Sequence, residues 1–210
     1  MWALVENNSI TSVLGSFSST ITIGSRNYDK KELNSMSDSE KLAIGLYPVT
    51  SASRFDETYY INHDPTYAIS GNTVVETITK AADKKLTDTN EVDENGDPFL
   101  DENGVQIVTL GLKSNAKNKA TTSANGYLQG FDWLIQRKVT ANTAIPSAVT
   151  TYMAAIRTDH GNICTALDAA ADMAAFIALH TTTYNEDKTV NVIAKTQSWT
   201  SDASVKSYRR

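Results

Sequence analysis

The sequence has few of the residues that build disulfides, metal clusters or membrane spans. It contains one cysteine, Cys164, so neither an internal disulfide nor a multi-cysteine zinc site can hold the fold. Its three histidines, His63, His160 and His180, are far apart, and none has a His-Glu-x-x-His spacing. No window approaches the roughly 20 apolar residues that span a bilayer. We therefore expect no cofactor, no metal and no membrane insertion.

Positive charge is also scarce. The formal net charge is −5, with 19 Lys and Arg against 24 Asp and Glu. Nucleic-acid-binding proteins normally carry a basic face that contacts phosphates, so we expect no nucleic-acid partner. The opening residues, MWALVENNSI, lack the basic region and long apolar run of a secretory signal. These features favour a soluble protein synthesised in a cytoplasm.

Signatures of catalysis are missing as well. The chain has no Gly-x-Ser-x-Gly elbow, no Walker loop and no dinucleotide-binding fingerprint. Asp168 and Asp172 would lie four residues apart on one helix, but alanines surround them, which favours a solvated helix face. Cys164 lies among apolar positions and is interpreted as a buried small hydrophobe. We predict no catalytic residues and a non-enzymatic protein.

Residues 1–80 have the pattern of a β-rich domain with one short helix. Residues 2–5 and 10–14 flank a turn cluster and predict a hairpin, and residues 19–24 alternate polar and apolar side chains. Ser37 and Glu40 form a capping-box pattern that opens a helix ending at Gly45. Three further extended segments are expected at residues 57–61, 66–69 and 73–79.

Residues 81–109 form a linker and a hairpin arm in which Asp-Glu-Asn-Gly occurs twice, at residues 93–96 and 101–104. An EF-hand calcium loop counted from Asp93 fails, because its sixth and twelfth positions are Pro98 and Gly104. A looser cation site stays open as the alternative. Each Asn-Gly pair is instead typical of a type I′ hairpin turn. The arm is therefore expected to have two turns and to contact the protein or a partner through Phe99 and Leu100.

The second half predicts two long helices that pack as an antiparallel hairpin over residues 110–180. Apolar residues recur at three- and four-residue spacing from Leu110 to Lys138, and again from Pro146 to about Leu179. Gly161 is expected to bend or split the second run. Residues 181–210 are expected to form an extended tail that Trp199 anchors. The fold class is therefore α+β, with four segments divided at residues 80, 109 and 180.

Two blocks of the sequence carry a family resemblance. MWALVENNSIT at the start resembles the opening of small tail-associated proteins of tailed bacteriophages, and SDSEKLAIGLYPV at residues 37–49 fits the helix and strand that follow. FDWLIQRKVTANTAIPSAVTTYMAAIRT, residues 131–158, is similar to a segment of phage tail-fibre assembly and fibre-connector proteins. This segment carries an Asp-Trp pair, an arginine, an Ala-Ile-Pro turn and a helix with tyrosine followed by Ile-Arg. The longer central arm and the tail ending SWTSDASVKSYRR depart from the pattern.

The resemblance implies a structural protein of the virion tail that joins tail or baseplate proteins to fibres. Its partners would be other tail or fibre proteins, and a homo-oligomer is expected, as a trimer or hexamer, because tails have three- or sixfold axes. The departures favour a particle component over the alternative, a tail-fibre assembly chaperone that leaves the particle. A carbohydrate-binding receptor module is a second alternative.

Large aromatic and apolar side chains are the interface candidates, because such residues dominate binding energetics. A position in the core is the competing interpretation for each aromatic residue. The candidates are Trp2, Phe99, Leu100, Trp133, Tyr152 and Trp199.

Overall fold

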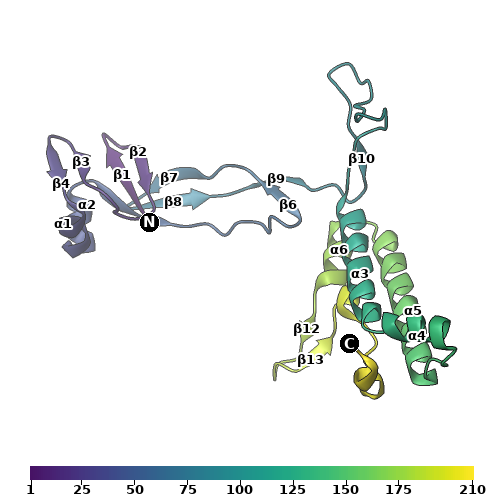
Figure 1. Cartoon of the computed structure of the whole chain (residues 1–210). Helices are drawn as coiled ribbons and strands as arrows, with labels where there is room; N and C mark the ends of the chain where they lie inside the picture. Colours follow the sequence, from purple (N-terminus) through teal and green to yellow (C-terminus); the bar gives the residue numbers. More distant parts are fainter. The chain divides into compact units, whose positions relative to one another are not determined.

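The computed structural model describes all residues from 1 to 210. The chain divides into two compact units, an N-terminal unit, Met1–Asp83, and a C-terminal unit, Lys84–Arg210. Strands dominate the first unit and helices the second, so the α+β class predicted from the sequence is confirmed (Figure 1).

A five-stranded sheet forms the body of the N-terminal unit. Its strands, in spatial order, are β2 (Ser9–Leu14), β1 (Trp2–Glu6), β5 (Leu46–Thr50), β8 (Thr73–Thr77) and β7 (Thr66–Ser70). Only the pair β5 and β8 is parallel; the other neighbours are antiparallel. The edge strands β2 and β7 also approach each other, so the sheet curls toward a barrel. The predicted hairpin of the first fourteen residues is confirmed as β1 and β2.

A small hairpin and two short helices cover the core of this sheet. The hairpin is β3 (Ile21–Ile23) with β4 (Arg26–Tyr28), and the helices are α1 (Lys30–Ser35) and α2 (Asp38–Ala43). The buried apolar cluster beneath them comprises Leu4, Phe17, Tyr28, Leu33 and Leu46.

The capping box at the start of α2 is present as predicted. The Ser37 hydroxyl accepts a hydrogen bond from the Glu40 backbone N–H, and the Glu40 carboxylate accepts one from the Ser37 backbone N–H. These bonds to Ser37 lower the pKa of Glu40 below its usual value. Gly45 follows the helix with a φ of +89°, a conformation in which a side chain would be strained.

A two-stranded ribbon completes the N-terminal unit. It pairs β6 (Tyr60–Asn62) with β9 (Lys80–Asp83) in antiparallel register. All four residues of β9 are exposed, and Ile61 of β6 is 50% exposed. The ribbon therefore contributes little apolar burial of its own.

The C-terminal unit has four helices where the sequence predicted two. These are α3 (Leu112–Gln129), α4 (Asp132–Ala141), α5 (Ser147–Ala169) and α6 (Met173–His180). The first predicted helix breaks at Gly130, and the second breaks after Ala169 instead of at Gly161. Gly161 stays inside α5, so the helix is not split there. The second break follows from Asp172, whose carboxylate accepts a hydrogen bond from the Ala175 N–H and caps α6.

The helices α3 and α5 are antiparallel, as the predicted hairpin requires. Lys117 near the start of α3 pairs with Asp168 near the end of α5 at 2.8 Å, and Thr121 contacts His160 at 3.0 Å. Small side chains on α3 face this interface: Ala116, Ala120 and Ala124 are buried. The core that these helices enclose is rich in large residues, namely Phe131, Leu134, Val149, Tyr152, Met153 and Ile156.

The last thirty residues are folded, in contrast to the extended tail expected from their polar sequence. They form a hairpin of β12 (Thr183–Tyr184) and β13 (Val190–Val192), then two 3₁₀ helices, η1 (Lys195–Gln197) and η2 (Ala203–Tyr208). Val205 of η2 is 3% exposed and belongs to the helical core. The Arg210 N–H donates to the Gly130 carbonyl at 3.0 Å, at the break between α3 and α4. Tertiary contacts therefore order this segment.

Candidate interaction surfaces

The arm in the first part of the C-terminal unit is built from two copies of the same turn. It starts and ends in a short ladder of β10 (Thr89–Asn90) and β11 (Val108–Thr109). In the first turn the Asp93 carboxylate accepts hydrogen bonds from the N–H groups of Asn95 and Asp97, at 2.8 and 2.9 Å. In the second turn Asp101 binds the N–H groups of Asn103 and Val105 in the same way, both at 2.8 Å.

These turns are not the type I′ turns predicted from Asn-Gly, because only the glycines have positive φ. Gly96 and Gly104 have φ values of +89° and +76°, whereas both asparagines have negative φ. The Gly96 N–H donates to the Asp93 carbonyl, so the turn is a type I turn followed by a left-handed glycine. The aspartate that opens each repeat decides this outcome, since its carboxylate binds the turn's N–H groups.

Hydrogen bonds to backbone groups stabilise the ionised form of both aspartates. The N–H groups of Asp97 and Asn95 lower the pKa of Asp93, and those of Val105 and Asn103 lower the pKa of Asp101. Both carboxylates are thus engaged inside their own turns. No group of three or more His, Cys, Asp or Glu side chains lies close enough together to hold a metal ion.

A closed ring of backbone hydrogen bonds joins the turns into one small body. The N–H of Glu91 donates to Ile107, that of Ile107 to Phe99, and that of Phe99 back to Glu91, at 2.8 to 2.9 Å. The side-chain amide nitrogen of Gln106 lies 2.6 to 3.2 Å from the three carbonyl oxygens of this ring. The arm is therefore a defined structure, and the position of Phe99 within it is fixed by the backbone.

The arm carries exposed apolar side chains and negative charge. Phe99 is 50% exposed and Leu100 is 54% exposed. Other large apolar residues here are also exposed: Val92, Val105, Ile107, Val108 and Leu110. The carboxylates of this segment are Glu91, Asp93, Glu94, Asp97, Asp101 and Glu102, and no Lys or Arg occurs between residues 86 and 112. An acidic surface with exposed apolar groups is suited to a protein partner with apolar and basic groups.

A second exposed apolar surface lies on the hairpin of β12 and β13. Every residue of both strands is exposed. Its large apolar side chains are each at least 50% exposed: Tyr184, Val190, Val192 and Ile193. A two-stranded hairpin with so little burial is marginally stable alone in water, so this surface is suited to contact with another molecule.

A cavity of about 180 Å³ lies between the last residues of the chain and the helices α3 and α5. Its walls include aromatic side chains, Tyr127, Phe131, Tyr152 and Trp199. Charged residues also line it, Asp202, Lys206 and Arg209. The Asp202 carboxylate accepts a hydrogen bond from the Ser204 N–H, and Arg209 donates to the Gly126 carbonyl at 2.7 Å. The cavity thus combines an apolar interior with a rim that holds two cations and one acid.

The remaining interface candidates from the sequence lie in or against a core. Trp2 packs on the N-terminal cluster, with its ring 6.2 Å from Phe17. Tyr152 is 7% exposed inside the helical core, and Trp133 and Trp199 are partly buried against that core. Trp199 lies 5.4 Å from Tyr127, ring to ring, so it anchors the last segment as expected.

The side chains that could take part in catalysis lie apart from one another or already form hydrogen bonds and ion pairs. Burial raises the pKa of the Cys164 thiol, which lies 3.5 Å from the His160 ring nitrogen. A raised pKa leaves less thiolate at neutral pH and makes a weaker nucleophile. Asp168 and Asp172 do not share a helix face, because Asp168 lies on α5, where it pairs with Lys117 of α3, and Asp172 caps α6.

Sequence reasoning missed the cavity and the pairing of β12 with β13. The cavity is lined by residues far apart in the sequence, such as Tyr127 and Arg209. The spacing of residues within either segment does not indicate that the two segments meet. The strand-like pattern of Thr189–Ala194 in the sequence is confirmed, since this segment contains β13.

No protein-family model matches the chain, and comparisons with curated proteins and with solved structures found no match. None of the helices combines the length and apolar character that a membrane crossing requires.

Proposed function

We propose that this protein is a non-enzymatic structural component of a bacteriophage tail. In that role it would connect tail or baseplate proteins to fibres as part of a homo-oligomer. The observation that best supports a structural role is the large solvent-accessible surface of the chain. The tail assignment rests on the resemblance of residues 1–11, 37–49 and 131–158 to tail-associated and fibre-connector proteins.

The chain exposes 13637 Å² of accessible surface. A compact monomer of 22.9 kDa would expose roughly 9,600 Å² by the usual scaling with mass. Two separate compact proteins of about 9 and 14 kDa, the sizes of the two units, would expose roughly 11,500 Å² together. The difference of about 2,000 Å² between the observed surface and this second value exceeds the roughly 800 Å² that each partner contributes to a standard interface. This excess supports a protein that completes its burial in an assembly.

The location of the exposed apolar side chains supports the same role. Most of the large ones lie on two-stranded ribbons: the β6 and β9 ribbon, the arm of residues 89–109, and the β12 and β13 hairpin. Such ribbons bury little within one chain and become stable when a partner covers them. An adaptor that joins several proteins needs separate contact surfaces of this kind.

The test is mass spectrometry of purified tailed particles together with the mass of the purified chain in solution. The proposal predicts the chain in particles at a stoichiometry that matches three- or sixfold symmetry. A chain found in infected-cell lysate and absent from particles would instead support an assembly chaperone. A chain that is both monomeric and absent from particles would refute the structural role.

A further inference from the structure

Two surfaces of the C-terminal unit have complementary chemistry. The arm presents the half-exposed ring of Phe99 on a segment, residues 86–112, whose charged side chains are all acidic. The cavity has aromatic walls, and Lys206 and Arg209 on its rim outnumber the single acid. An aromatic group on an acidic segment therefore matches an aromatic-lined cavity whose cations outnumber its single acid.

The cavity has the size of the group that would fill it. Cavities of about 150 Å³ in protein cores admit benzene. At about 180 Å³, the cavity beside Trp199 and Tyr152 has room for the benzyl side chain of a phenylalanine. Edge or offset contacts with the surrounding rings would add to the hydrophobic gain.

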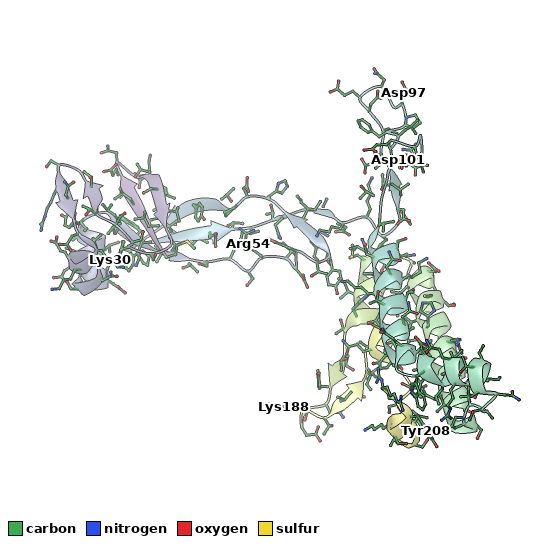
Figure 2. All side chains as sticks on the ribbon, viewed as in Figure 1. Lys30, Arg54, Asp97, Asp101, Lys188 and Tyr208 are labelled. Atoms are coloured by element: carbon green, nitrogen blue, oxygen red, sulfur yellow. The ribbon has the colours of Figure 1, made fainter.

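The two surfaces lie at opposite ends of α3, so one chain cannot join them. The arm adjoins the start of the helix, whereas Tyr127 of the cavity lies fifteen residues further along α3, about 22 Å away. Figure 1 shows the arm leaving the helices at the end opposite η2, and Figure 2 shows Asp97 and Asp101 far from Tyr208. Any contact between the arm and such a cavity must involve two molecules.

We propose that the arm of one copy inserts Phe99 into the cavity of a second copy. This inference rests on the proposed structural role and specifies one contact of the homo-oligomer. When the contact repeats head-to-tail, the copies close into a ring or continue as a filament. The backbone ring that holds Phe99 in place lowers the entropy lost on insertion.

Cysteine cross-linking between two differently tagged proteins tests this contact directly. Both carry Cys164→Ser; one also carries Leu100→Cys beside Phe99, and the other Ser201→Cys at the cavity. Mixing under mild oxidation should give a disulfide-linked pair that contains one of each. The matched control replaces Ser201→Cys by Glu186→Cys on the exposed β12 and β13 hairpin, and its yield should be several-fold lower.

Sedimentation of single variants supplies the second measurement. Phe99→Ala should weaken self-association roughly 30-fold, the size typical for loss of an aromatic anchor. Val139→Ala, at an 80% exposed position on α4, should leave it unchanged. Equal cross-linking of both cysteine pairs, or self-association that Phe99→Ala does not weaken, would overturn the inference. In either case, incorporation of the chain into particles would still support the proposed function. A wild-type chain that stays monomeric at high concentration would also overturn the inference.

Discussion

The indole N–H of Trp133 donates a hydrogen bond to the carbonyl oxygen of Tyr208 at 2.8 Å. The bond ties the start of α4 to the last 3₁₀ helix, and the guanidinium of Arg210 lies 4.0 Å from the centre of the Trp133 ring. Trp133 therefore fixes the segment that forms one wall of the cavity.

Replacement of Trp133 by phenylalanine should destabilise the C-terminal unit. Trp133→Phe keeps an aromatic ring but leaves the Tyr208 carbonyl without its donor, which costs about 1 to 3 kcal/mol. Urea unfolding followed by circular dichroism measures the change. Val139→Ala is the matched control and should change the free energy of unfolding by less than about 0.5 kcal/mol, as exposed substitutions do. An unfolding midpoint that does not move would show that the bond contributes nothing.

Two glycines should respond to alanine in opposite directions. A Cβ atom at Gly111 would lie 2.4 Å from the Thr87 carbonyl carbon and oxygen, and backbone atoms cannot move away easily. Gly111→Ala should therefore destabilise the start of α3 by about 1 to 3 kcal/mol. A Cβ atom at Gly161 meets nothing within 4 Å, so Gly161→Ala should stabilise α5 by about 0.5 to 1 kcal/mol. Thermal unfolding of both variants checks the two signs.

Gln106 should hold the arm together through its amide nitrogen. Gln106→Ala removes the donor from the three carbonyl oxygens of the backbone ring, and Gln106→Glu places a carboxylate against them at neutral pH. Hydrogen exchange of the Phe99 and Ile107 amides should become faster in both variants, and more so in Gln106→Glu. Exchange at α5 amides such as that of Ile163 should not change and serves as the internal control. Equal exchange in all three proteins would show that the side chain has no structural role.

Acid should loosen the turns of the arm. Asp93 and Asp101 have folded-state pKa values below their ordinary value, because backbone N–H groups bind their ionised forms. This contribution to stability is present above the ordinary pKa of about 4 and is lost as the pH falls through the lowered value. Amide chemical shifts of Asn95 and Asn103 should report the change below about pH 4. Asp93→Asn, which cannot ionise, should remove the response from Asn95 alone.

Deletion of residues 92–104 should remove the arm and leave both units folded. The deleted segment makes its backbone hydrogen bonds within the arm, so the helical core keeps its contacts. We expect an unchanged far-ultraviolet spectrum from the helices and weaker incorporation into particles. Normal incorporation would show that the arm is only a linker.

Local signals in the sequence predicted the local structure well. The capping box of Ser37 and Glu40 fixed the start of α2, because both partners lie within one turn of the chain. The hairpin of the first fourteen residues also depends on neighbours in sequence. In such cases the residues that decide the structure are adjacent, and pattern reasoning can find them.

Other features depend on contacts that a single segment does not encode. Gly161 stays helical because α5 packs along its length, and packing overrides the weak helix propensity of one glycine. The second helix breaks where Asp172 caps α6, although the same aspartate looked like a helix-surface residue. The cavity could not be predicted, since the last segment docks on α4 through the bond between Trp133 and Tyr208, which are 75 positions apart.

The strand order of the N-terminal sheet has a consequence for folding kinetics. The central strand β5 pairs with β1 on one side and in parallel with β8 on the other. Val49 meets Val74, and Trp2 meets Pro48, so both central pairings close long loops. Such loops lose entropy before their contacts form, which slows folding. The hairpin of β1 and β2 can form early, but the sheet can close only after β8 has been synthesised.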